Sequence, residues 1–183
     1  MSVDPLTLYK LMTLYMLNKV NFPLTNAQLS GFFQEKGYTS YIGFQQVLTE
    51  LEETKLISYE TIRNTYYYNI TKDGIETINF FVKKIPVEVI DDMDIFLMEN
   101  RYEMRNEVAT TADFFHSTKN NQEYLVNCKI KEGNTMLMEL NLSVPSEEVA
   151  EMMCNNWRSA SQDIYAYVMK TLMKKKKKKE NIE

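Results

Sequence analysis

The stretch Thr25–Ile70 decides the fold. It reads TNAQLSGFFQEKGY over residues 25–38 and TSYIGFQQVLTELEETKLI over residues 39–57, and it ends in TYYYNI. Thr25 suits the N-cap of a helix, and Gln28 three residues later can complete a capping box with it. A glycine follows that helix, where a left-handed C-terminus favours glycine. The stretch therefore predicts a helix, a turn, a second helix and a two-stranded hairpin.

The second helix, over about residues 40–54, has two different faces. At roughly 100° per residue, one side of the helix is apolar, and the opposite side carries mainly amide and hydroxyl side chains with one isoleucine and one glutamate. The apolar side holds Tyr41, Phe44, Val47, Leu48 and Leu51, and the opposite side holds Ile42, Gln45, Gln46, Thr49 and Glu53. We expect the first set to be buried and the second to face solvent.

The hairpin that follows, over about residues 56–70, is rich in β-branched and aromatic residues. Residues 56–60 and 65–70 are expected to be its strands, and residues 61–64 its tip. Arg63 is the only basic residue in that tip. Helices are expected on both sides of the stretch, over residues 5–19 and about 72–84.

The second half of the chain changes its hydrophobic period. The Ile85-Pro86 step marks the expected domain boundary, so residues 1–85 form one domain and residues 86–173 another. Period-two alternation predicts a three-stranded antiparallel sheet, whose apolar face needs a covering helix. The expected elements are a helix over 87–108, three strands within 110–143 joined by turns at 119–121 and 132–134, and a helix over 145–173. This α-β-β-β-α unit makes the fold class α+β.

Charge is spread unevenly along the chain. The net charge is −4. Residues 1–85 have a net charge of 0, residues 86–173 carry −8, and residues 174–183 carry +4. The lysine-rich tail at 174–183 is expected to be disordered. The alternative for Lys174–Lys179 is a flexible arm that binds phosphate backbone without sequence preference.

No set of residues in the chain indicates catalysis. His116 is the only histidine, and Cys128 and Cys154 each sit in an apolar pattern, so all three are interpreted as structural residues. No glycine-rich phosphate-binding motif is present. We expect no catalytic residue, no metal and no cofactor, and hence not an enzyme. The two cysteines, with no recognisable signal peptide or apolar membrane span, predict a cytoplasmic protein without membrane contact.

The segment at the end of the predicted hairpin carries a resemblance to a known family. Tyr67-Tyr68-Asn69-Ile70-Thr71 and then Gly74 resemble the corresponding segment of winged-helix regulators of the multiple-antibiotic-resistance and PadR-like kind, over about residues 6–84. The whole chain resembles a bacterial family of small winged-helix proteins, the domain of unknown function number 4364. This resemblance implies an N-terminal winged helix-turn-helix and a DNA-binding role.

On that basis we expect a DNA-binding transcriptional regulator. The helix at about 40–54 would enter the major groove of double-stranded DNA, and the wing at about 56–70 would contact flanking DNA. The expected contacts are Ile42, Gln45, Gln46 and Thr49 near base edges, Thr39 and Ser40 at phosphate, and Arg63 and Asn64 from the wing. The expected partners are DNA, a second copy in a homodimer, and a small-molecule effector sensed by the C-terminal unit.

The alternative is a non-catalytic protein-interaction module. It would use the winged helix as a scaffold and the acidic half, residues 86–173, to bind a basic partner. Two observations favour it: the net charge of −8 on that half, and the absence of Arg and Lys from Tyr41 to Glu53.

Overall fold

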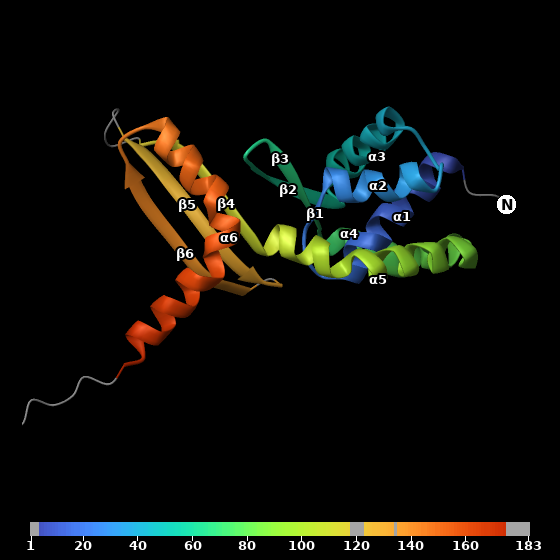
Figure 1. Ribbon diagram of the computed structural model, residues 1–183. Coiled ribbons are helices and arrows are strands. Elements are labelled where there is room, and N and C mark those ends of the chain that lie inside the picture. The colour runs from blue at the N-terminus through green and yellow to red at the C-terminus, as the bar shows by residue number, and fades with distance from the viewer. Residues whose placement is uncertain (1–3, 118–122, 134, 175–183) are drawn as a thin grey trace, which may run out of the picture.

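The chain folds into helices and two small sheets arranged in two halves (Figure 1). The computed structural model describes residues 4–117, 123–133 and 135–174. Within them are six α-helices and two three-stranded antiparallel sheets, which confirms the predicted α+β class. In chain order the elements are α1 (Pro5–Val20), β1 (Leu24–Thr25), α2 (Asn26–Glu35), α3 (Tyr41–Glu53), β2 (Ile57–Ile62), β3 (Thr65–Ile70), α4 (Lys72–Phe81), the 3-10 turn η1 (Val82–Lys84), α5 (Val87–Ala109), β4 (Thr110–His116), β5 (Tyr124–Glu132), β6 (Thr135–Val144) and α6 (Glu147–Leu172).

Five of these helices begin at a side chain that accepts a hydrogen bond from the backbone N–H three residues later. The capping residues are Asp4, Thr25, Ser40, Thr71 and Ser146. Each such bond satisfies one of the N–H groups that the first turn of a helix leaves without a partner. At α2 the predicted capping box is complete, because the Gln28 side chain also accepts from the Thr25 N–H at 2.9 Å.

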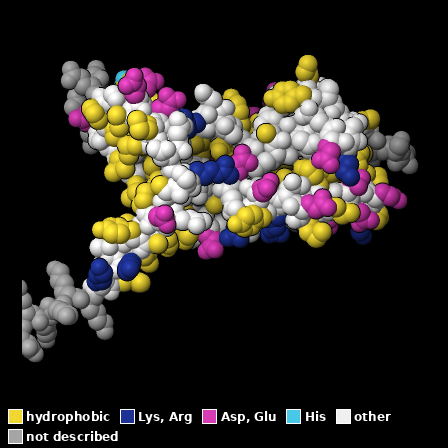
Figure 2. Space-filling view, viewed as in Figure 1, with side chains coloured by type: hydrophobic (Ala, Val, Ile, Leu, Met, Phe, Trp, Pro, Cys, Tyr) yellow, Lys and Arg dark blue, Asp and Glu magenta, His cyan; other side chains and the backbone are white. Residues whose placement is uncertain are grey.

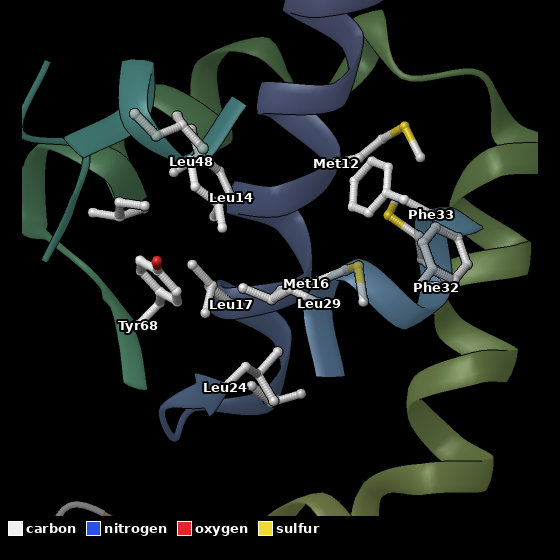
Figure 3. Close-up of a cluster of buried hydrophobic side chains, with 14 of the residues drawn as sticks. Met12, Leu14, Met16, Leu17, Leu24, Leu29, Phe32, Phe33, Leu48 and Tyr68 are labelled. Carbon is white, nitrogen blue, oxygen red and sulfur yellow. The ribbon is translucent and has the colours of Figure 1, made fainter. Parts of the chain in front are cut away.

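The first core is built around α1, which is buried on several sides. Met12, Leu14 and Met16 are almost completely shielded from solvent. Around them lie side chains from α2, α3 and the first sheet (Figure 3). A helix that buries apolar side chains around most of its circumference is the centre of a core and not a surface element. Helix α3 and the β2–β3 hairpin are thus packed on the same core.

The first sheet has the strand order β1-β3-β2, all antiparallel. Its β2–β3 hairpin is longer and tighter than the sequence predicted, because β2 continues to Ile62 and only Arg63 and Asn64 form the loop. The predicted four-residue tip at 61–64 is wrong. Both loop residues have positive φ, 47° and 62°. Two-residue loops of that conformation match the right-handed twist of paired strands, so the ladder can run to the turn.

Helix α5 packs with the first core, although it belongs to the predicted second unit, residues 86–173. Its buried side chains Met93, Leu97, Met104 and Val108 all belong to the cluster around α1. The helix then passes into β4 with no intervening loop. The two cores therefore divide at the end of α5, because the apolar stripe of this helix packs against α1 and α2.

The second sheet has the order β4-β5-β6, and α6 covers one of its faces (Figure 1). Its core includes Val126, Cys128 and Trp157, and the Trp157 indole N–H donates to the Lys129 carbonyl at 3.2 Å. The predicted turn at 119–121 lies outside the described residues, as does the tail beyond residue 174. No helix in the described part of the chain is long and apolar enough to cross a bilayer.

Candidate nucleic-acid interface

The outer face of α3 carries a narrow ridge of uncharged side chains, with Glu53 exposed in the last turn of the helix. Phe44 and the other apolar residues of the predicted stripe are buried, except Tyr41, which is about half exposed. On the opposite side Ile42 is 82 % exposed, and Gln46 and Thr49 are also exposed. The structure thus brings Ile42, Gln46 and Thr49 together as one ridge, which we call the α3 ridge.

Gln45 is half-buried and is not part of the ridge. Its side-chain amide forms two hydrogen bonds with that of Asn26 at the start of α2, at 2.8 and 3.1 Å. Such a reciprocal pair uses a donor and an acceptor on each residue and fixes both side chains. Gln45 therefore sets the position of α3 against α2.

The polar groups of the ridge are partly bonded to their own helix. The Gln46 amide donates to the Glu50 carboxylate at 2.9 Å, and the Thr49 hydroxyl donates to the Gln45 carbonyl at 3.0 Å. Glu50 also pairs with Lys10, and hydrogen bonds from Lys10 and then from Gln46 lower the pKa of its carboxyl. All these groups reach solvent, so an incoming partner can exchange these bonds for its own.

The N-terminus of α3 is shaped by Thr39, Ser40 and Gly43. The Ser40 hydroxyl accepts from the Gly43 N–H at 3.2 Å, so it acts as the helix cap. A Cβ at position 43 would lie 2.4 Å from the Thr39 Oγ1, so the glycine leaves room for that side chain. Thr39 and Ser40 are in place at the helix N-terminus, but the cap already uses one Ser40 oxygen lone pair.

The hairpin tip lies against the second unit. The Arg63 N–H donates to the Asp113 carboxylate on β4 at 3.3 Å, and its Nη1 donates to the Asn155 side chain on α6 at 2.8 Å. Farther along the hairpin, Lys131 pairs with Glu60 at 3.4 Å. Arg63 is therefore bonded to the second unit, while its neighbour Asn64 is exposed and lines a groove that α2 and α3 also line.

A groove of about 750 Å³ separates α2 and α3 from the hairpin. Gln45 and Asn64 line it, together with three partly exposed tyrosines that sequence reasoning did not select: Tyr41, Tyr59 and Tyr66. The Tyr59 and Tyr66 rings meet edge to face, 5.2 Å between centroids. The sequence did contain a signal for Tyr59 and Tyr66, because tyrosines on the two strands of a predicted hairpin are expected to lie beside one another.

The charge of this face is slightly negative. Residues 41–70 carry Lys55 and Arg63 against Glu50, Glu52, Glu53 and Glu60, a net charge of −2. In the space-filling view the surface over α2 and α3 is mostly white and yellow, with little dark blue (Figure 2). The face offers hydrogen-bonding and aromatic groups and few cations.

The three residues considered for catalysis or metal binding, His116, Cys128 and Cys154, lie on β4, β5 and α6. Cys128 and Cys154 are free and buried, and burial raises the pKa of the Cys128 thiol to about 11. The His116 ring lies 4.2 Å from that of Tyr124. No group of three or more His, Cys, Asp or Glu side chains in the described ranges is arranged to hold a metal ion.

A family model matches almost the whole of this architecture, from residue 9 to residue 172. The chain belongs to the family described as a domain of unknown function (DUF4364). The match runs through both halves, so α3, the hairpin, the second sheet and α6 are all parts of the DUF4364 domain. No curated protein and no solved structure matches the chain.

Proposed function

We propose that the N-terminal half is a winged helix and that the protein is a DNA-binding regulator that reads the major groove with α3. The order of the elements supports this proposal: a central helix, a short strand, two helices of which the second is exposed, and a hairpin that pairs with the short strand. This helix-turn-helix-plus-wing order recurs in DNA readers. The wing is the β2–β3 hairpin.

The observation that carries the proposal is the α3 ridge. It exposes a branched apolar side chain, an amide and a hydroxyl along one line of a helix packed on a rigid body. A glutamine amide can donate to and accept from an adenine edge, and Ile42 can contact a thymine methyl group. Gln45 acts by positioning α3 through Asn26, and Thr39 and Ser40 lie where a phosphate would approach the helix N-terminus.

The charge of the face determines what kind of DNA binder this is. Each neutralised phosphate contributes about 0.9 to the slope of log affinity against log salt. The wing tip supplies one arginine per protomer, and the ridge supplies none. We therefore expect affinity that depends weakly on salt and comes mainly from base contacts, unless the lysines at 174–179 add to it.

The test is selection of fragments from a random-sequence DNA pool, followed by binding measurements with Gln46→Ala. This variant should bind the selected fragments at least about fivefold more weakly, since a bidentate base contact contributes about 1–3 kcal/mol. Its melting temperature should stay unchanged because Gln46 is exposed. Gln162→Ala, an exposed glutamine on α6, is the matched control. A large fall in the melting temperature of Gln46→Ala would show that this residue is structural instead.

We further propose that the protein is a homodimer joined through β6 and the end of α6. Strand β6 is ten residues long, lies at the edge of its sheet, and has Glu139 as its only charged residue. Helix α6 has no buried residue after Ser161, yet Tyr167, Leu172 and Met173 there are largely exposed. A long edge strand with a single charged residue is prone to pair with another chain, and a second copy would cover both this edge and the end of α6.

A second candidate function, a protein-interaction module, is favoured by the tyrosine groove and by the net charge of −2 on residues 41–70. Tyrosines are common in protein interfaces, and a slightly acidic groove suits a basic polypeptide segment. Binding to an array of Lys- and Arg-rich peptides that Tyr66→Ala removes, with no DNA selected, would establish this function in place of the first.

A further inference from the structure

A separate cavity lies between the two halves, where the wing, the end of α5, β4 and α6 meet. Its volume is about 430 Å³, within the range of small-molecule sites. The residues around it come from four parts of the chain that only the folded structure brings together. The space-filling view shows dark-blue side chains in this central region, between the halves (Figure 2).

Two arginines converge on this cavity in a chain that is acidic overall. Arg63 reaches it from the wing tip and Arg158 from α6, against one carboxylate, Glu107. The Glu107 carboxylate already accepts a hydrogen bond from the Gln28 side chain on α2. The residues that line the cavity therefore carry a net charge of +1, with the Asp113 carboxylate next to Arg63 outside the lining, while residues 86–173 as a whole carry −8.

Both guanidinium groups keep donors available. Arg63 uses Nη1 for the Asn155 side chain, and its other side-chain N–H groups form no hydrogen bond with the residues that the structure describes. The Arg158 guanidinium forms no hydrogen bond or ion pair within the described part of the chain. An arginine carries five N–H donors in a fixed fork that matches the oxygens of a carboxylate or a phosphate.

The lining also contributes hydroxyl groups, beside the less polar side chains of Ile62, Ala112 and Cys154. Tyr67 on β3, which is only 9 % exposed, and Thr110 and Thr111 at the start of β4 contribute side-chain oxygens. Hydroxyls can donate to an anion or accept from a ligand hydroxyl, so they suit a polar body attached to the charged group. The volume exceeds what a lone anion would fill.

We propose that this cavity binds the carboxylate or phosphate group of a small polar molecule between Arg63 and Arg158. The bound oxyanion joins the wing to α6 more firmly than the single Arg63–Asn155 side-chain bond does. Charge-assisted, bidentate bonds of this kind are roughly twice as strong as neutral ones. Asn155 remains at the edge of the site and keeps Arg63 pointed toward α6.

One consequence rests on the proposed DNA function. Arg63 is the cation that the wing tip would offer to DNA, so an oxyanion that holds Arg63 competes with DNA for it. Coupling between two ligands is reciprocal, so DNA would weaken anion binding by the same factor. The cavity is then the effector site of the regulator.

The experiment that tests the site contains no DNA, so its failure is distinguishable from failure of the DNA proposal. The full-length protein is titrated by calorimetry with inorganic phosphate and, separately, with succinate, against sodium chloride at equal ionic strength. Arg63→Gln and Arg158→Gln each remove one cation from the cavity, and Arg101→Gln removes one from an exposed position on α5 outside it. Arg158→Lys keeps the charge but loses the fork.

At least one of the two anions should bind the wild-type protein, and the one that binds identifies the recognised group. Each cavity Gln variant should weaken that binding at least about tenfold, as expected for a lost hydrogen bond to a charged group. Arg158→Lys should weaken it less, and Arg101→Gln should leave it unchanged. Melting temperatures within about two degrees of wild type would show that the variants fold. No binding of either anion, or equal binding by Arg158→Gln, would overturn the proposal.

Discussion

At the scale of single residues, Gly74 occupies a position where no side chain fits. It follows the Thr71 cap of α4, where Thr71 also donates through its backbone N–H and hydroxyl to the Leu56 carbonyl. A Cβ on Gly74 would lie 2.1 Å from that carbonyl oxygen and 2.8 Å from the Ile70 Cγ1. The glycine thus allows α4 to lie directly against the backbone between α3 and the wing.

Gly74→Ala should therefore destabilise the protein by about 1–3 kcal/mol, the usual cost of overpacking. Gly31→Ala is the matched control, because it lies inside α2 with no atom within 4 Å of the new Cβ. That substitution should stabilise by up to about 1 kcal/mol through helix propensity. Urea denaturation of the two variants measures both effects. Equal stabilities would show that the close approach at Gly74 is not present in solution.

The two buried thiols make stability depend on alkaline pH. Burial raises the pKa of Cys128 from its ordinary value of 9.0 to about 11, and burial also raises the pKa of Cys154. As the pH rises, the thiols therefore lose their protons at a lower pH in the unfolded chain than in the folded protein. The stability they contribute is fully present below pH 9 and is lost as pH rises toward 11.

We expect the free energy of unfolding to fall between pH 9 and pH 10.5, and to fall less steeply in Cys128→Ala. Burial raises the pKa values of Tyr67 and Tyr68 as well, so the wild-type slope includes them, and the comparison with the variant isolates the thiol. Denaturation curves at several pH values provide the measurement. Identical slopes for the two proteins would mean that Cys128 titrates normally when folded.

At the scale of elements, local signals in the sequence were sufficient for most boundaries. The Thr25 capping box and, apart from Tyr41, the apolar stripe of α3 depend only on residues close in the chain, and the structure confirms them. The tip of the β2–β3 hairpin is narrower than predicted, because strand pairing as far as Ile62 depends on the twist of the hairpin and not on residue preference. Asn64 was a signal for the two-residue loop, because asparagine adopts positive φ more readily than most residues.

The proposed dimer belongs to this scale, because it depends on the edge of β6. Leu142 is partly exposed on that strand. Leu142→Lys should halve the mass measured by light scattering, since a charge in a self-paired edge prevents association. Met98→Lys, on the exposed side of α5, is the control and should not change the mass. A monomeric wild-type protein would refute the dimer.

At the scale of the whole molecule, the sequence could not show how the two halves meet. The contacts that join them are made by residues far apart in the chain, such as Arg63 with Asn155, Lys131 with Glu60, and Arg105 with Glu132. None of these pairs has a local pattern. The same is true of α5, whose stripe is compatible with either core until the positions of α1 and α2 are known.

These contacts change the interpretation of the candidate site residues. Ile42, Gln46 and Thr49 lie together as the helical period predicted, since that prediction needed only the geometry of one helix. Gln45 is paired with Asn26, and Arg63 is bonded to the second unit, because their partners come from other elements. Their assignment as DNA contacts remains a prediction, with Gln45 in a positioning role.

The central claim, that α3 reads DNA, is tested most directly by one binding measurement on protein truncated after Met173. The truncation removes the lysines at 174–179. Fragments selected from a random-sequence pool are then titrated with this protein across a salt series. We expect the truncated protein to keep its preference for the selected sequences, and the slope of log affinity against log salt to have a magnitude of about 2 for a dimer with one arginine per wing. Equal binding of all fragments, or no binding at low salt, would contradict it.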